Sequence, residues 1–304
     1  METLREIRRR IRSIHNLSQV TRALEAVSAS RVQKAQAAVL ATRPYAHRAW
    51  EVIVNLANLP GSATHPLLTY REQICSVVIV LFTSDRGLCG AYNQNVVRAA
   101  LDYVERLGVP ARYIAVGRRG RDMLWRLRAN LVAEFTGLAA IPTMRDVATV
   151  AQVAIQEFLQ CGCDEVFLAY TAFVNLMQQH PVIQRLLPLR PSKLEEQAVS
   201  RYVMDMRPIG VSDYIYEPDQ TAILDTVLPR FTELQVYQAA LEAAASEHAA
   251  RRMAMRSATD NAEDLLRDLT LVRNKARQQA ITSELLDIAG GAEALQQLQG
   301  ARRA

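Results

Sequence analysis

The sequence predicts an α/β protein whose two ends form a long antiparallel coiled coil and whose middle forms a globular domain. Three observations support this fold class. Residues 230–289 contain neither Gly nor Pro, apolar residues recur with helical spacing near both ends, and short apolar runs alternate with helical segments between them. We therefore expect three parts, comprising residues 1–59, 70–216 and 219–304.

The last part contains the most regular stretch of the chain. An unbroken helix over Arg230–Ala289 would span about 90 Å, whereas a small domain is only about 30 Å across. Such a helix must project from a domain and needs a partner for its apolar face. Its predicted seam follows Leu265, Leu269 and Val272, which are spaced by four and three residues. The adjacent glycines at 290–291 predict the end of the helix.

The first part predicts a second long helix, to about residue 58. Ile7, Ile11 and Ile14 follow heptad spacing, but the same register then reaches polar side chains. We therefore expect the apolar stripe to shift from these polar positions to adjacent apolar residues. The polar positions are Ser18, Thr21, Glu25 and Ser28, and the apolar neighbours are Leu17, Val20, Leu24 and Val27.

Pro44 predicts a kink or a break in this first helix. Two apolar seams in one chain are most simply satisfied when the helices that carry them pack against each other. We therefore expect residues 4–40 and 230–289 to run antiparallel, with Ile7, Ile11 and Ile14 against the last helix.

The middle of the chain predicts a Rossmann-like α/β domain, because apolar strands alternate with helices. The expected strands are Cys75–Phe82, Arg112–Gly117, Leu131–Phe135 and Glu165–Tyr170, with edge strands at Leu186–Pro188 and Tyr214–Tyr216. The expected helices are Gln94–Leu107, Arg118–Ala129 and Arg145–Gln160.

Three local motifs raise the question of a chemical site. The segment SDRGLCGAYN occupies the place of a phosphate loop but lacks the G-x-G-x-x-G and Walker patterns, so a tight turn or a partner-binding loop is the alternative. Gly117–Gly120 is either a short anion nest or a solvated helix start. Cys161 and Cys163 are too few for a structural zinc site, and reduced thiols are expected. The five histidines are scattered, so we expect no enzyme active site, no metal and no cofactor.

The net charge of +5 is concentrated at the start of the chain, where residues 1–48 carry ten Lys or Arg against three acidic residues. This leaves a nucleic-acid-binding coiled coil open, beside a small-molecule-binding α/β protein. The apolar seam favours contact with acidic protein surfaces instead. No apolar run approaches the roughly 20 residues of a membrane span, and the N-terminus lacks a signal-peptide pattern, which predicts an intracellular protein.

Longer motifs resemble the gamma subunit family of the rotary F-type ATP synthase over essentially the whole chain. They are METLREIRRRIRSIHNLSQVTRALEAVSASR, TSDRGLCGAYN, YIYEPDQTAILDTVLPR and SEHAARRMAMRSATDNAEDLLRDLTLVRNKARQQAITSELLDIAGGA. The resemblance implies a non-catalytic central rotor shaft that couples ion-driven rotation of a membrane c ring to ATP synthesis or hydrolysis at alpha–beta sites.

The resemblance also implies partners and contact residues. The implied partners are the alpha, beta and epsilon subunits and the c ring, with the chain held peripherally at the cytoplasmic face of the cell membrane and touching the membrane only through the complex. Arg251, Gln278 and Thr282 match positions that contact beta subunits. Tyr214, Tyr216 and Glu217 match the segment that faces the c ring and epsilon.

Overall fold

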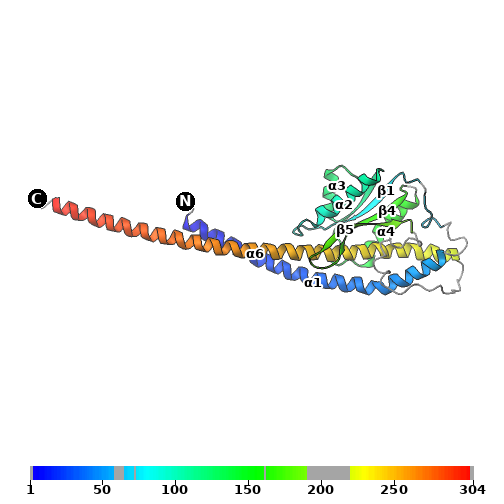
Figure 1. Ribbon diagram of the computed structural model, residues 1–304, viewed down its shortest axis with the longest axis horizontal. Coiled ribbons are helices and arrows are strands. Elements are labelled where there is room, and N and C mark those ends of the chain that lie inside the picture. The colour runs from blue at the N-terminus through cyan, green and yellow to red at the C-terminus, as the bar shows by residue number, and fades with distance from the viewer. Residues whose placement is uncertain (1–2, 58–64, 72, 161, 190–219, 302–304) are drawn as a thin grey trace. The chain divides into compact units, whose positions relative to one another are not determined.

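The computed structural model in Figure 1 describes residues 3–57, 65–71, 73–160, 162–189 and 220–301. The chain divides into two units. One, here called the helical unit, consists of Met1–Glu25 and Met255–Ala304. The other, here called the α/β unit, consists of Ala26–Ala254. Helices α1 (Leu4–Ala57) and α6 (Gln220–Ala301) each contribute to both units.

The remaining helices and strands lie in the α/β unit and alternate along the chain, except that the last two are both strands. They are β1 (Val77–Phe82), α2 (Tyr92–Leu107), β2 (Ala111–Val116), α3 (Arg118–Arg126), β3 (Asn130–Phe135), α4 (Met144–Leu159), β4 (Glu165–Phe173) and β5 (Gln179–Leu187). The predicted alternation is confirmed, with element ends that differ from the expected ones by a few residues.

The sheet has the strand order β3-β2-β1-β4-β5. The pairings among the first four strands are parallel, as predicted. β5 is much longer than the expected edge strand at Leu186–Pro188, and it pairs antiparallel with β4. The connection between them, residues 174–178, is too short for a crossover, so the chain must turn back beside β4. The other expected edge strand, Tyr214–Tyr216, lies outside the described residues.

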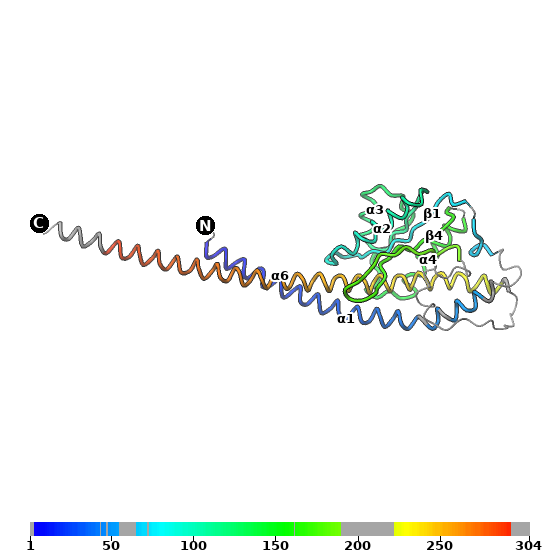
Figure 2. Tube along the Cα trace, in the orientation of Figure 1, coloured from blue at the N-terminus to red at the C-terminus, as the bar shows by residue number. Residues whose placement is uncertain are grey.

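Alternate residues of β1 face two separate cores, which explains why its sequence is apolar throughout. Val78, Val80 and Phe82 pack into a cluster with α4 and with parts of α1 and α6. Ile79 and Leu81 pack with α2 and α3. The traces in Figures 1 and 2 show α2 and α3 on one face of the sheet and the helix pair with α4 on the other.

Within the α/β unit, α1 and α6 run antiparallel. The Thr42 hydroxyl accepts a 3.4 Å hydrogen bond from the Gln238 side chain. Eight residues later on α1, the Trp50 ring lies 5.5 Å from that of Phe231, so rising numbers on α1 meet falling numbers on α6. The predicted antiparallel arrangement is confirmed.

Pro44 does not break α1, and the glycines at 290–291 do not end α6, although the sequence predicted a kink or break at the first and a helix end at the second. α1 passes through Pro44 without a break, and the burial of Ala46, Trp50 and Ile53 just beyond it compensates for the lost backbone hydrogen bond. α6 continues through Gly290 and Gly291 to Ala301. A glycine costs only about 1 kcal/mol in a helix interior, and the residues that follow are mainly Ala, Glu, Leu and Gln, which favour helix.

Candidate functional site

In the helical unit, α1 and α6 meet through polar side chains. The hydroxyl groups of Thr21 and Thr259 are 2.6 Å apart and share a hydrogen bond, and both residues are buried. Each hydroxyl also lies near a carbonyl oxygen of its own helix. The Arg22 guanidinium donates to the Glu263 carboxylate at 2.5 Å in a largely exposed ion pair. The two helices are therefore joined by specific hydrogen bonds rather than by an apolar seam alone.

The seam of α1 keeps one heptad register, and the predicted move of its stripe is wrong. The register runs through Ile7, Ile11, Ile14, Ser18, Thr21, Glu25, Ser28, Val32 and Ala35, all buried or half-buried. Thr21 is 5% exposed, whereas the neighbouring Val20 is 56% exposed. Small hydroxyl residues allow close helix approach and can bond to their own backbone, so a polar position is tolerated in the seam.

The isoleucines predicted to face α6 differ in their burial. Ile7 is buried, and Ile11 and Ile14 are half-buried. Their contact with α6 stays a prediction.

The seam of α6 differs from the predicted one at two of three positions. The buried or half-buried positions with heptad spacing are Met255, Thr259, Ala262, Leu266, Leu269, Arg273 and Ala276. Leu269 belongs to them as predicted, but Leu265 is 52% exposed and Val272 is also exposed. The pair Leu265-Leu266 allows either register. The partner helix decides it, since Thr21 pairs with Thr259.

Several large apolar side chains lie outside the seams, on the exposed sides of both helices. In the helical unit α1 exposes Leu17 and Val20, and α6 exposes Leu265, Leu271, Val272, Ile281, Leu285, Leu286 and Ile288. These apolar side chains lie among charged and polar residues, and their number is unusual for helices that face only water. Such a surface marks a place where partners bind.

Gln278 and Thr282 lie on this exposed part of α6. They are four residues apart, so both point to one side of the helix. Their side chains are exposed. Both residues lie beyond Ala276, where the seam ends, and near the exposed Ile281 and Leu285. They are accessible to a partner, and their role as beta-subunit contacts stays a prediction.

Arg251 has a different environment, at the centre of what we call the anchor cluster of Glu247, His248 and Arg251. The residue is only 8% exposed. Its guanidinium donates to the Glu247 carboxylate at 2.7 Å and to the carbonyl oxygens of Gly87 at 3.3 Å and Arg86 at 3.5 Å. These bonds attach α6 to the loop after β1. The predicted contact of Arg251 with a beta subunit is not tested by this geometry.

The protonation states in the anchor cluster follow from its hydrogen bonds. His248 Nε2 lies 3.1 Å from the Ala140 carbonyl and must donate to it, so Nδ1 accepts from Arg251 at 3.1 Å. Burial, reinforced by the positive charges of Arg251 and Arg31, lowers the pKa of His248 to about 4. Burial raises the pKa of Glu247, although Arg251 opposes this. The histidine is therefore neutral beside a buried ion pair.

The SDRGLCGAYN loop is cross-linked internally, which favours the structural reading of this motif. The Ser84 amide donates to the Asn93 side-chain oxygen at 2.9 Å, and the Asn93 amide group donates to the Ser84 hydroxyl at 2.8 Å. The Tyr92 hydroxyl donates to the Ala243 carbonyl of α6 at 3.1 Å. The loop thus connects α6 to the sheet at the place where a phosphate would otherwise bind.

The Gly117–Gly120 turn is occupied in a similar way. The Asp85 carboxylate accepts from the Arg118 amide at 2.9 Å and from the Gly137 amide at 2.7 Å. An intramolecular carboxylate therefore takes the place of an anion in this nest.

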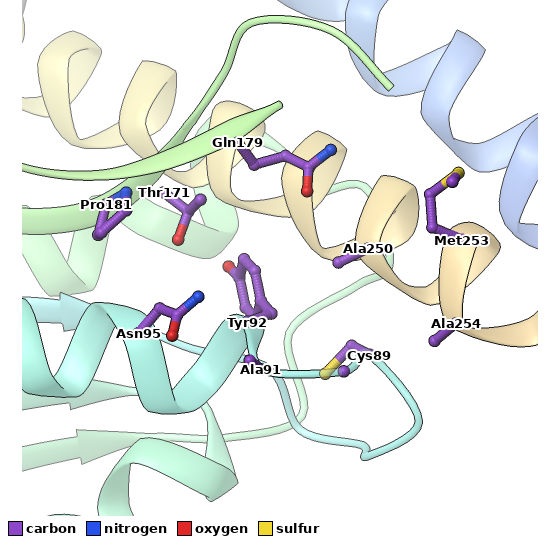
Figure 3. A pocket seen from close by; sticks show the side chains of 11 residues that line it. Cys89, Ala91, Tyr92, Asn95, Thr171, Gln179, Pro181, Ala250, Met253 and Ala254 are labelled. Carbon is purple, nitrogen blue, oxygen red and sulfur yellow. The ribbon is translucent and has the colours of Figure 1, made fainter. Parts of the chain in front are cut away.

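A pocket of about 280 Å³ opens beside the loop, between α2, α6 and the β4–β5 hairpin. Figure 3 shows Tyr92, Asn95, Thr171 and Gln179 around it, with Met253 and Ala254 on the α6 side. Its lining contains no charged side chain. The pocket lacks the charged groups that recognise a nucleotide phosphate.

Other expected features have the following outcome. Cys75, Cys89 and Cys163 are free thiols, and Cys161 lies outside the described residues. Tyr214, Tyr216 and Glu217 also lie outside them. Within the described ranges, no group of three His, Cys, Asp or Glu residues could hold a metal ion. None of the described helices combines the length and apolar character needed to cross a membrane.

The fold and the site define a class: an α/β domain joined to two long antiparallel helices that expose apolar side chains. A family model described as ATP synthase matches residues 3–295. The chain belongs to this family.

Curated relatives carry one description. The ATP synthase gamma chain of Dehalococcoides mccartyi strain CBDB1 is 44% identical over 298 residues, covering 97% of this chain and all of that one. The ATP synthase gamma chain of Roseiflexus castenholzii is 46% identical over 303 residues, covering 98% of this chain and all of the relative.

Solved structures share the fold at lower identity. A chain of the Euglena gracilis mitochondrial ATP synthase, in the structure of its OSCP/F1/c-ring, aligns with a TM-score of 0.65 at 21% identity, covering 96% of this chain and 94% of that one. A chain of the Tetrahymena thermophila mitochondrial ATP synthase central stalk and c-ring aligns with a TM-score of 0.59 at 24% identity, covering 79% and 99%.

Proposed function

We propose that this protein is the central rotor shaft of an F-type ATP synthase, which couples ion-driven rotation of a membrane c ring to ATP synthesis or hydrolysis at alpha–beta catalytic sites. The observation that carries this proposal is the set of exposed apolar side chains on two joined long helices, found in a chain that is similar over its whole length to ATP synthase gamma chains. A central shaft needs two helices that stay joined and exposed side chains that contact the surrounding alpha and beta subunits.

The proposed mechanism is a coupling free energy rather than chemistry in this chain. Each rotor angle offers different side chains to the alpha and beta subunits, so each catalytic site has a different nucleotide affinity at each angle. The chain itself is non-catalytic, and ATP turnover belongs to the assembly. The epsilon subunit and the c ring are the further partners, and the assembly is held at the cytoplasmic face of the cell membrane.

The test uses the exposed apolar positions of α1. Leu17→Gln with Val20→Gln changes two side chains that lie outside the seam, so the helix pair should stay joined. Loss of two partner-buried apolar side chains should lower the recovery of alpha and beta subunits, or their ATP turnover, by about tenfold or more. Arg9→Gln with Ser13→Gln, also exposed on α1, is the matched control.

Two results would overturn the proposal. One is wild-type assembly and turnover in the Leu17 and Val20 variant. The other is a purified complex that holds alpha and beta subunits but more than one copy of this chain, because a central shaft is present once.

A further inference from the structure

A separate surface of the α/β unit, on α3, carries positive charge and an exposed tryptophan. It consists of Arg118, Arg119, Trp125, Arg126, Leu127 and Arg128, and we call it the α3 face. Figure 1 shows α3 on the face of the sheet opposite the helix pair, with α2. A partner bound to the α3 face would therefore not disturb the packing of α1 and α6 on the opposite face of the sheet.

The fold seats α3 in one fixed orientation. Its buried side consists of Gly120 and Leu124. A side chain on Gly120 would come within 2.6 Å of Thr83, and the Gly120 amide donates to the Thr83 hydroxyl at 2.9 Å. The Arg119 amide donates to the Ser84 carbonyl at 3.0 Å. Because α3 is held so closely to the end of β1, its opposite side cannot turn inward.

The exposed side of α3 is strongly cationic. Arg118 and Trp125 are seven residues apart, as are Arg119 and Arg126, so the four share one side of the helix. Arg121 is neutralised by Asp122 and Glu134. By contrast, the guanidinium groups of the four arginines of the α3 face form no ion pair with any residue that the structure describes. Four arginine side chains of this kind, within or just after one short helix, attract an acidic partner.

Trp125 is the second component of the α3 face. It is 78% exposed, whereas the only other tryptophan, Trp50, is buried in the core. Leu127 beside it is also exposed. Tryptophan and arginine are the residues that contribute most to protein–protein binding energy, and arginine pairs with carboxylates in a two-pronged geometry.

The same observations argue against the other anionic partners. A helix that lies in a membrane surface needs an extended apolar side, whereas here the exposed apolar groups are Trp125 and Leu127 alone. Single-stranded nucleic acids are bound by several stacking aromatics along a basic groove, and α3 offers one. We propose that the α3 face is a docking site for an acidic segment of a partner protein, with an apolar pocket that receives the Trp125 side chain.

The test places a photo-crosslinking residue at the centre of the face. p-Benzoylphenylalanine replaces Trp125 in the full chain within its native complex, and crosslinked peptides are identified by mass spectrometry. The same residue at Met177, another highly exposed position of the α/β unit, reports background. We expect a crosslink above background to one Asp- and Glu-rich segment of another protein.

Charge reversal then separates specific docking from chance proximity. Arg118→Glu with Arg126→Glu should lower the crosslink yield about tenfold, and Lys substitutions at the captured acidic residues should restore it. Arg98→Glu with Arg145→Glu makes the same change in net charge at exposed positions outside the face and should leave the yield unchanged. Crosslinks at background level, crosslinks to lipid or nucleic acid, or equal loss in both charge variants would overturn the proposal. The outcome is independent of the rotor function, because it does not involve ATP turnover.

Discussion

At the residue scale, Arg251 is buried and takes part in several hydrogen bonds at once. The family resemblance implied that Arg251 contacts a beta subunit, which stays a prediction; within this chain the residue is buried and bonded to the loop after β1. Its guanidinium satisfies the Glu247 carboxylate and two loop carbonyl oxygens at once. Removing one member of such a buried group leaves the others without partners, which costs more than the bond itself contributes.

We predict that Arg251→Met destabilises the protein by about 3 kcal/mol, because the Glu247 carboxylate then stays buried without its partner. Glu247→Gln in the same chain should recover much of this loss. Urea unfolding of the four chains of this double-mutant cycle gives the coupling energy. Arg256→Met, at an exposed position of α6, is the control. Equal effects of Arg251→Met and Arg256→Met would show that the anchor cluster contributes nothing specific.

We also predict a pH dependence from His248. Its pKa is about 4 in the folded protein and about 6.5 when unfolded, so between these values the unfolded chain binds more protons. Stability from this group is therefore lost as pH falls from 6.5 toward 4, by about 2 kcal/mol at pH 5. The raised pKa of Glu247 acts in the opposite sense, because its contribution is lost as pH rises.

Comparing wild type with His248→Gln isolates the histidine, since glutamine can still donate to Ala140 but does not titrate. The difference in unfolding free energy between pH 7 and pH 5 should shrink in the variant. The same pH dependence in both proteins would refute this assignment.

At the element scale, the two long helices are joined by a register that apolar periodicity did not predict. The seam of α1 passes through Ser18, Thr21 and Ser28, and the seam of α6 passes through Thr259 and Arg273. A polar seam residue specifies register because a displaced hydroxyl loses its partner.

We predict that Thr21→Cys with Thr259→Cys forms a disulfide on mild oxidation, because the replaced hydroxyl oxygens are only 2.6 Å apart. Val20→Cys with Leu265→Cys places both thiols outside the seam and should remain reduced at this pair. Non-reducing peptide mapping distinguishes these products from bonds to the native cysteines. Efficient bonding in the control pair, and not in the threonine pair, would mean that the seam has the other register.

At the scale of the whole molecule, both units expose large apolar side chains. In the helical unit, residues 278–292 of α6 are exposed on every side. A single helix with this many apolar residues is not stabilised by the chain itself, so its order depends on what surrounds it.

We predict that Gln278→Ala with Thr282→Ala lowers multi-site ATP hydrolysis by the alpha–beta complex of this chain while assembly stays intact. Both side chains can bond one loop of a partner at one rotor angle and release it at the next. Arg277→Ala with Ser283→Ala changes adjacent exposed positions and should have a smaller effect. Wild-type turnover in the Gln278 and Thr282 variant would contradict the prediction and would mean that torque is transmitted by the shape of the helices.

The sequence by itself determined the elements and their order. The apolar run of β1, the alternation of strands and helices, and the two long terminal helices are local patterns with strong periodicity. The full-length motifs also indicated the family, because long matched segments are far more specific than short ones.

Only the tertiary structure decided which residues of those elements face each other. The local sequence pattern does not distinguish Leu265 from Leu266 as the seam residue. Thr21 is favourable in the seam only because its hydroxyl is paired with that of Thr259. The same holds for Arg251, whose partners are Glu247 one turn away and the loop carbonyls more than 160 residues earlier. The local sequence determines the spacing at which apolar residues recur. The partner surface determines which positions are buried, because burial and hydrogen bonding depend on atoms that are distant in the chain.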